Sequence, residues 1–336
     1  NQPCLSILCR TDSLRKMIVE AKLNDDGRRI DRVLRKMLKS MPLSLLYRLL
    51  RTGAIRLNGS RVTPDARLSE GDIILLPNTL TDKIVAPRTS NSRVPISENL
   101  AKPDLPALIN NDQIFVINKP AGVSVAGPET ESPLPLSHRV EPMLAHQVPD
   151  SLSFRPVPVH RLDRICSGLL IYAKTIQAAR KLTAMFRESR ATKVYLALLE
   201  RTVHRPELLQ APLSYDSTRR RAVLEPSAKL LSAYVHPISR VAGTTLAAIS
   251  TNTGRRHQVR ALCAQSGMPL AGDRRYGSSR SCRPFLHAWL LSSTDSFLLD
   301  TIKAGYIEAL PHSSRLSQHY TNWQQSADAL RTLYSS

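Results

Sequence analysis

The apolar residues of this 336-residue chain change their spacing once, and that change constrains the fold more than any other feature. Between Gly27 and Pro77 apolar residues recur at helical intervals. From Gln113 onward they form short runs separated by turns, a pattern typical of strands. The stretch 78–112 is rich in proline, serine and asparagine and has no apolar period, which indicates a linker. Two domains are therefore expected, after an extension at 1–26: the first at 27–77 and the second, with a C-terminal tail, at 113–336.

The two domains should differ in architecture, and together they predict the α+β fold class. The first should be a small helical and hairpin domain with helices over 30–38 and from Pro42 to a stop at Gly53. The dipeptide Asn58-Gly59 signals a tight turn, and Ile73–Leu76 a closing strand. The second domain should contain a mixed, largely antiparallel sheet, with strands expected at 114–117, 169–172, 194–199 and 244–249.

The charge of the chain points to a polyanionic partner. Lysine and arginine number 47 against 27 acidic residues, which gives a net charge of +20 and a pI near 10.3. Nucleic acid is the usual polyanion for such a protein. An acidic membrane surface is the other candidate, but no apolar run approaches the length of a membrane-spanning helix.

Positive charge is concentrated in the first domain. Residues 27–77 contain 11 basic and 4 acidic residues, a net of +7. A solvated surface that happens to be basic is the alternative. Clustering favours phosphate contact, for which the expected residues are Arg28, Arg29, Arg32, Arg48, Arg51 and Arg56.

The first domain resembles the small RNA-binding domain named after ribosomal protein S4. The resemblance rests on three motifs and covers about fifty residues. These motifs are Arg29–Leu34, Tyr47–Gly59 and Leu68–Asp72.

The run His160-Arg161-Leu162-Asp163-Arg164 places one carboxylate between two arginines, just before an apolar strand. Neighbouring cations keep a carboxylate ionised, and an ionised carboxylate can act as a nucleophile. By itself the run fits a surface ion pair better than a nucleophile.

Five further blocks lie along the second domain, one before the Asp163 run and four after it. Each alone could be an ordinary turn, a packed strand or the basic start of a helix. Taken together with the Asp163 run, they resemble the RluA-type RNA pseudouridine synthases over about residues 113–300. The first domain resembles the module that one branch of that family carries ahead of its catalytic domain. The five blocks are 119–122, 193–197, 253–260, 273–277 and 286–288.

The resemblance implies roles for individual residues. Asp163 matches the family's nucleophile, Tyr195 the tyrosine that stacks on the target base, and Arg255 the arginine that pairs with the carboxylate. Arg161 matches the arginine that supports the flipped-out nucleotide. RNA contacts are also expected from Arg256 and Arg260. The family requires no metal and no organic cofactor.

One departure from the family leaves a second function open. Ile165 and Cys166 stand where the family usually has an acidic residue and a threonine. The first hypothesis is an enzyme that isomerises uridines in structured RNA, with large-subunit ribosomal RNA as the expected substrate. The alternative is an assembly factor for the large ribosomal subunit that binds this RNA, with ribosomal proteins or other assembly factors as further partners and with weak or no catalysis. A high pI, an arginine-rich composition and a first residue, Asn1, that is not methionine favour the mitochondrial matrix, with the bacterial cytoplasm as the alternative location.

Overall fold

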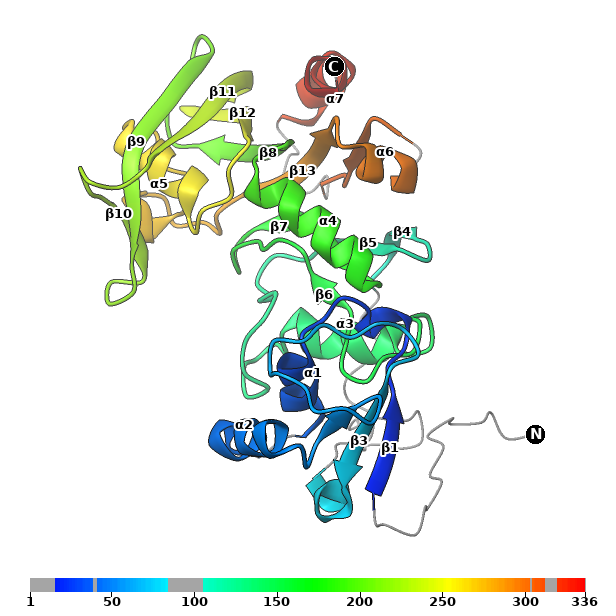
Figure 1. Ribbon diagram of the computed structural model, residues 1–336. Helices are drawn as coiled ribbons and strands as arrows, with labels where there is room; N and C mark the ends of the chain where they lie inside the picture. The colour runs from blue at the N-terminus through cyan, green and yellow to red at the C-terminus, as the bar shows by residue number, and fades with distance from the viewer. Residues whose placement is uncertain (1–15, 39–40, 84–104, 303, 312–318, 336) are drawn as a thin grey trace. The chain divides into compact units, whose positions relative to one another are not determined.

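The computed structural model describes residues 16–38, 41–83, 105–302, 304–311 and 319–335 (Figure 1). The chain divides into two compact units. The small unit comprises 1–103 together with two short segments from further along the chain, 143–156 and 174–177, and the large unit comprises the rest. Much of the expected extension and of the expected linker lies outside the described residues.

The small unit contains two helices and a three-stranded antiparallel sheet of order β1-β3-β2. The expected helical spacing is confirmed, because Ile30, Val33 and Leu34 are fully buried in its core. Gly53 ends the second helix in the left-handed conformation, with a φ of 74° that glycine adopts without strain. The elements are β1 (Lys16–Glu20), η1 (Leu23–Asp25), α1 (Ile30–Met37), α2 (Leu43–Thr52), β2 (Arg56–Leu57), β3 (Ile73–Pro77) and η2 (Asn78–Lys83).

Residues 16–26, which the sequence analysis placed in an extension, contribute to this sheet. β1 pairs with β3 along its whole length, from Lys16 opposite Pro77 to Glu20 opposite Ile73. This strand was not expected, because five residues after a stretch without pattern give little periodic signal.

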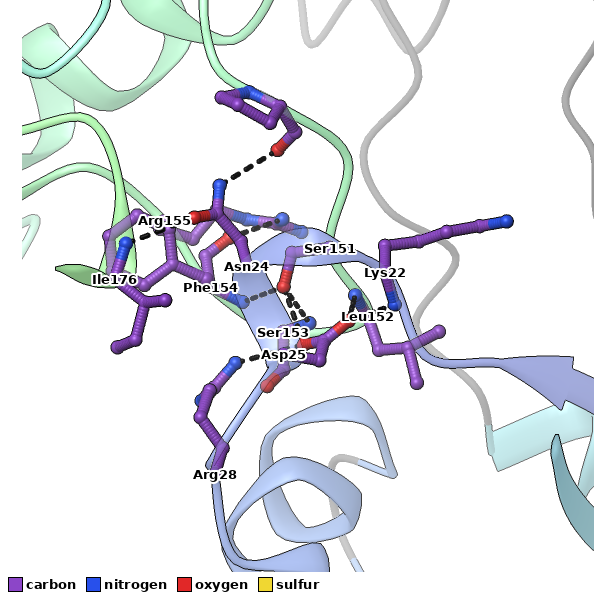
Figure 2. Close-up of polar contacts among 11 residues, drawn as sticks. Lys22, Asn24, Asp25, Arg28, Ser151, Leu152, Ser153, Phe154, Arg155 and Ile176 are labelled. Atoms are coloured by element: carbon purple, nitrogen blue, oxygen red, sulfur yellow. Dashed lines mark hydrogen bonds and ion pairs between the residues drawn. The ribbon is translucent and has the colours of Figure 1, made fainter. Parts of the chain in front are cut away.

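Two buried polar side chains join distant segments inside the small unit (Figure 2). The carboxylate of Asp25 accepts hydrogen bonds from Ser151 Oγ at 2.6 Å and from the backbone N–H of Leu152 at 2.8 Å. Asn24 donates to the carbonyl of Pro149 at 3.1 Å and accepts from the N–H of Ile176 at 2.9 Å. The segments 143–156 and 174–177 are therefore built into the small unit by specific bonds.

The large unit is built on an 11-stranded sheet whose main path runs β10-β9-β11-β12-β8-β13-β7-β5-β4. β14 pairs with β13, and β6 pairs with β7. The pairs are antiparallel except that β13 and β7 run parallel. The strands are β4 (Ala107–Asn110), β5 (Ile114–Lys119), β6 (Val157–Pro158), β7 (Ser167–Ala173), β8 (Ala191–Leu199), β9 (Glu207–Asp216), β10 (Arg221–Leu224), β11 (Leu230–Val241), β12 (Thr244–Thr251), β13 (Leu286–Ser293) and β14 (Tyr306–Glu308).

This sheet confirms the α+β class and its largely antiparallel character. The four expected strands correspond to β5, β7, β8 and β12. β9 and β11 were not predicted, because Pro212 and Pro237 interrupt their apolar alternation. The ladder of β11 shifts register between Pro237 and Ser239, which is how the strand accommodates the missing N–H.

Helices pack on the sheet of the large unit, and α7 closes one part of its core. Trp323 on α7 is 5% exposed and meets buried Trp289 of β13 edge to face, with ring centroids 6.3 Å apart. The C-terminal helix therefore docks through Trp323. The helices are α3 (Leu136–Leu144), α4 (Ile176–Arg187), α5 (Gln258–Gln265), η3 (Arg274–Tyr276), α6 (Ser296–Ile302) and α7 (Tyr320–Ser335).

Within the described residues, no helix combines the length and apolarity needed to cross a bilayer. The same residues hold no group of three or more histidine, cysteine, aspartate or glutamate side chains placed to bind a metal ion.

Candidate active site

Asp163 lies in the loop that joins β6 to β7, and the loop is fixed by backbone bonds. The backbone carbonyl of Asp163 accepts a hydrogen bond from the N–H of Cys166 at 3.0 Å. The neighbouring residue Arg164 is bonded on both sides to Gly122: its carbonyl accepts from the Gly122 N–H at 2.7 Å, and its Nε donates to the Gly122 carbonyl at 2.9 Å. The turn at 119–122 therefore braces the loop that carries the carboxylate.

The carboxylate of Asp163 faces two basic side chains from α5 and its N-terminus. Arg260 Nη1 lies 3.5 Å from Oδ2, and His257 Nε2 lies 3.9 Å from Oδ1. The Asp163 side chain is 16% exposed and the Arg260 side chain 6%, so water screens their attraction weakly. The carboxylate is thus held by an arginine yet still reachable from one side.

Arg260 is itself fixed by a second carboxylate. Its Nε and Nη2 donate to the two oxygens of Asp273 at 2.7 and 2.9 Å, which is the bidentate geometry that suits a guanidinium. Burial opposes the charge of Arg260, but the hydrogen bonds to Asp273 and the charge of Asp163 outweigh it and raise its pKa. Arg260 is therefore a rigid, permanently charged partner for Asp163.

This arrangement corrects two assignments from the sequence. The arginine expected to pair with Asp163 was Arg255, whereas the structure gives that ion pair to Arg260, five positions further along. Arg255 is exposed and lines a pocket that also contains Asp163. Arg260 was expected to contact RNA, but it is buried and committed to Asp273 and Asp163. Position 260 lies in the first turn of α5, where its side chain is buried against Asp163 and Asp273, and the linear motif does not show this direction.

Tyr195 comes from the middle of the sheet. It lies on β8, opposite Ile249 of β12 and Ala288 of β13, and reaches the pocket that contains Asp163. Burial, with the charge of Asp163 adding to it, raises the pKa of Tyr195. The side chain therefore offers an aromatic face and a protonated hydroxyl at neutral pH.

One pocket collects the side chains that the sequence singled out for chemistry. The described residues that line it come from the Asp163 loop, from β8, from the end of β12 and from the start of α5. Carboxylate, phenol and guanidinium groups therefore converge within the large unit. The lining residues are Arg161, Leu162, Asp163, Cys166, Tyr195, Thr251, Thr253–Arg260 and Leu286.

The side chain of Gln258 shapes the turn that enters α5. It is 3% exposed, and its Oε1 accepts from the N–H of Arg255 at 3.0 Å. Its Nε2 donates to the carbonyl of Ser232 at 3.1 Å and to Thr251 Oγ1 at 3.0 Å. His257, at the N-cap, has a φ of 58°, a left-handed conformation that is uncommon outside glycine. These bonds hold His257 in that conformation, with its ring toward Asp163.

The remaining arginines expected to bind RNA fall into two groups, of which the first contacts other side chains of the protein. Arg28 and Arg29 are ion-paired to Asp25 and Asp31, at 3.1 and 2.8 Å. Arg256 is exposed and stacks over the ring of Tyr215 at 4.1 Å. The second group is exposed to solvent and consists of Arg32, Arg48, Arg51, Arg56 and Arg161.

Several residues near Asp163 were not predicted as part of the site. Lys119 is fully buried, and its Nζ donates to the carbonyls of Pro120 and Val123 at 2.9 and 2.7 Å. Burial lowers its pKa to about 8, although the charge of Asp163 opposes this. Cys166 is buried, and burial raises the pKa of its thiol to about 12, so it is an inert filler rather than a nucleophile.

His257 and Tyr276 were also missed as site residues, although both belong to blocks that the sequence singled out. Nothing in those blocks separates a histidine that faces a carboxylate from one that packs in a core. His287, in contrast, belongs to the scaffold: its Nε2 lies 2.7 Å from the carbonyl of Ala309, and its Nδ1 lies 2.8 Å from Ser167 Oγ.

The chain is similar in sequence to two protein families and to several known proteins. Residues 113–265 match the family described as RNA pseudouridylate synthase, and residues 28–74 match the S4 domain. The chain is 33% identical to ribosomal large subunit pseudouridine synthase C of Vibrio vulnificus over 78% of its own length and 81% of the relative's. It is also 33% identical to the protein of the same name from Escherichia coli, over 83% and 85%. A solved structure of human RNA pseudouridylate synthase domain containing 1 aligns with a TM-score of 0.49 and 22% identity, covering 65% of this chain and 95% of that one.

Proposed function

The chain belongs to the RluA-type RNA pseudouridine synthases that carry an N-terminal S4 domain, and from this premise we propose that Asp163 is the nucleophile with which it isomerises uridine in large-subunit ribosomal RNA. One observation carries the proposal. An ion-paired but reachable carboxylate shares a pocket with an aromatic side chain and with exposed arginines.

The reaction needs a nucleophile for the nucleotide and a face on which the detached base can turn. The bond between N1 of the base and C1′ of the ribose breaks, and a bond between C5 and C1′ forms. C5 then loses its hydrogen as a proton and N1 gains one, so the product is an isomer of uridine. Asp163 supplies the attacking carboxylate, and Arg260 holds its other oxygen in place.

Tyr195 supports the base rather than removing its proton. Its raised pKa keeps the hydroxyl protonated at neutral pH, which makes it a poor base but a good stacking surface and hydrogen-bond donor. A target base inside a duplex is out of reach of this pocket, so the nucleotide must flip out of its stack. The exposed guanidinium of Arg161 at the pocket can hold the phosphate of the flipped nucleotide.

The small unit contributes binding to the RNA backbone. Arg32 on α1, Arg48 and Arg51 on α2, and Arg56 on β2 present exposed guanidinium groups. Arginine contacts to phosphate add affinity and orientation but read little sequence, so they serve structured RNA in general. The names of the relatives, which are ribosomal large subunit pseudouridine synthases, support ribosomal RNA as the target.

The experiment is pseudouridine mapping across large-subunit ribosomal RNA from cells that carry the wild-type protein or Asp163→Ala. Sites that depend on the protein should disappear in Asp163→Ala and remain in the control Asp328→Ala, whose carboxylate is 88% exposed on α7. Sites that persist without Asp163 would refute the assignment. Loss of subunit assembly that Asp163→Ala rescues would instead support the assembly-factor alternative.

A further inference from the structure

The hydroxyl of Tyr276 lies between a strand amide and a histidine that faces Asp163. The backbone N–H of Ala222 in β10 donates to it at 2.7 Å, and its oxygen lies 2.9 Å from His257 Nδ1. Both side chains are buried, at 6% and 8% exposed. The other ring nitrogen of His257, Nε2, is the atom 3.9 Å from Asp163 Oδ1. A continuous polar path thus leads from a backbone amide to the candidate nucleophile.

The Ala222 hydrogen bond has a fixed direction, and it favours one placement of the proton at His257. An N–H can only donate, so the Tyr276 oxygen accepts from Ala222 and its own proton must go elsewhere. Within the described residues, the second partner of this hydroxyl is His257 Nδ1. Donation to Nδ1 requires that Nδ1 be unprotonated, and the neutral imidazole then carries its proton on Nε2.

This tautomer decides what Asp163 faces. A proton on Nε2 presents an N–H to the carboxylate, whereas the opposite tautomer would present a lone pair to it. The ring stays neutral near neutral pH, so the choice between the two tautomers remains. Burial lowers the pKa of His257 to about 4 against the opposing charge of Asp163. The positive charges of Arg260, Arg256 and Arg275 add to the effect of burial.

The same tyrosine also touches the arginine on the other side of the carboxylate. The guanidinium of Arg260 lies over the Tyr276 ring, 4.9 Å from its centroid. Tyr276 ends η3, and Asp273, which precedes η3, holds Arg260 from its far side. One short element therefore contacts both groups that flank Asp163.

We propose that Tyr276 is a positioning residue for Asp163: its hydroxyl sets His257 as the Nε2–H tautomer, and its ring supports the guanidinium of Arg260. The inference rests on the proposed function for its catalytic consequence. The tautomer itself is independent of turnover and can be measured without RNA.

The first test is the nitrogen spectrum of the histidine rings in the intact protein labelled with ¹⁵N-histidine, with His257 assigned by its loss in His257→Gln. Wild-type protein should show the Nε2–H tautomer at His257, and Tyr276→Phe should shift it toward Nδ1–H. Tyr215→Phe is the matched control, because the Tyr215 ring also meets His257, at 5.5 Å edge to face. The Tyr215 hydroxyl is buried without a hydrogen-bond partner in the described part of the chain.

The second test is pseudouridine formation in a large-subunit ribosomal RNA transcript. Tyr276→Phe should lower kcat at least about tenfold with KM changed less than about threefold, since the hydroxyl acts on the carboxylate and not on RNA. In a His257→Gln background, where no tautomer exists to be set, removing the hydroxyl should lower kcat by less than about threefold. Tyr215→Phe should keep wild-type kcat.

The outcomes separate the two proposals. A wild-type Nδ1–H signal overturns the inference even if Tyr276→Phe fails to fold, and so does a Tyr276→Phe enzyme with an unchanged tautomer or unchanged kcat. An equal loss of kcat in both His257 backgrounds also overturns it, because the hydroxyl would then act through the fold alone. A wild-type protein that forms no pseudouridine refutes the proposed function, while the tautomer measurement still decides the inference.

Discussion

A single guanidinium, that of Arg260, ties together two carboxylates, and this is the most consequential contact at the scale of residues. Lysine cannot replace it, because an ammonium is a point charge without the planar fork that serves Asp273 with two hydrogen bonds. Arg255, in contrast, is exposed at the pocket and has room to meet the RNA.

These two arginines predict opposite kinetic effects. Arg260→Lys should lower kcat by at least about tenfold and leave KM almost unchanged, because a loosened Asp163 affects the chemical step. Arg255→Lys should mainly raise KM, since it changes a contact with RNA. Steady-state kinetics on one RNA transcript measures both. A loss of kcat confined to Arg255→Lys would restore Arg255 as the partner of Asp163.

A second prediction at this scale concerns acid stability and His160. This residue is half-buried, its Nε2 accepts a hydrogen bond from the N–H of Ile171 at 3.1 Å, and desolvation of the ring lowers its pKa from 6.5 to about 3. Below pH 6.5 the His160 ring binds a proton in the unfolded chain but stays neutral in the folded chain. The contribution of the neutral His160 ring to the unfolding free energy is fully present above pH 6.5 and is lost progressively as the pH falls toward 3.

Urea unfolding at different pH values measures this loss. From pH 7.5 to pH 5, His160 should account for about 2 kcal/mol of the decrease in unfolding free energy. His160→Gln keeps an acceptor but no titrating group, so the decrease should be smaller by that amount. An identical decrease in both proteins would contradict the prediction.

The sequence allowed part of this site to be predicted. Asp163 and Tyr195 were named from their motifs, and both line the pocket, although their catalytic roles stay predictions. The identity of the paired arginine could not be read, because residues 255 and 260 belong to one motif, and only the fold shows that 255 precedes α5 and is exposed whereas 260 lies in α5 and is buried. Contacts of this kind depend on the three-dimensional backbone and not on spacing alone.

At the scale of elements, the parallel pair of β13 and β7 is the junction that places the Asp163 loop. Gly168 of β7 lies opposite Ala288 of β13 and has a φ of 109°. A Cβ at this position would overlap the backbone oxygen and nitrogen of Ala288. No side chain fits where the two strands meet, just after the nucleophile loop.

Gly168→Ala should therefore lower the unfolding free energy by more than the strain of a left-handed backbone conformation alone would. We expect a loss of at least about 3 kcal/mol in unfolding free energy, because the two strands must separate to accept the methyl group. Gly267→Ala is the matched control, since its φ is 70° but nothing lies within 4 Å of the added Cβ. That variant should lose only about 1 kcal/mol. Equal losses in chemical denaturation would show that steric overlap at Ala288 is absent.

The elements themselves were predicted unevenly. Helices α1 and α2 and strands β5, β7, β8 and β12 follow strong periodic patterns and were expected. The expected α+β class followed from them. Strands β9 and β11 contain Pro212 and Pro237, and the β11–β12 ladder shifts register at Pro237, so local pattern does not identify these strands.

At the scale of the whole molecule, the small unit is not one continuous stretch of sequence. Asp25, which is fully buried, bonds to Ser151 and Leu152 across more than a hundred residues (Figure 2). Arg28 shares the same carboxylate at 3.1 Å. Segment 143–156 has no clear helical or strand pattern, so the sequence gives no sign that it folds with the S4 domain.

Asp25→Ala should release this segment. Removing the carboxylate leaves the N–H of Leu152 and the charge of Arg28 without this acceptor, which should lower the local unfolding free energy by about 3 kcal/mol. Hydrogen exchange of the intact protein should then show faster exchange in peptides that cover residues 149–154. Glu20→Ala, which removes a partly exposed ion pair with Lys22, is the control and should leave those peptides protected. Unchanged protection in Asp25→Ala would contradict the proposed anchoring.

Release of tritium from C5 shows whether Asp163 gives this family member catalytic activity on ribosomal RNA. The substrate is a large-subunit ribosomal RNA transcript carrying [5-³H]uridine, and RNA binding by each protein is measured alongside. Wild-type protein should release tritium, whereas Asp163→Asn should bind the same RNA with similar affinity but release none. Tritium release that survives in Asp163→Asn, or wild-type protein that binds the transcript without releasing any, would contradict this prediction.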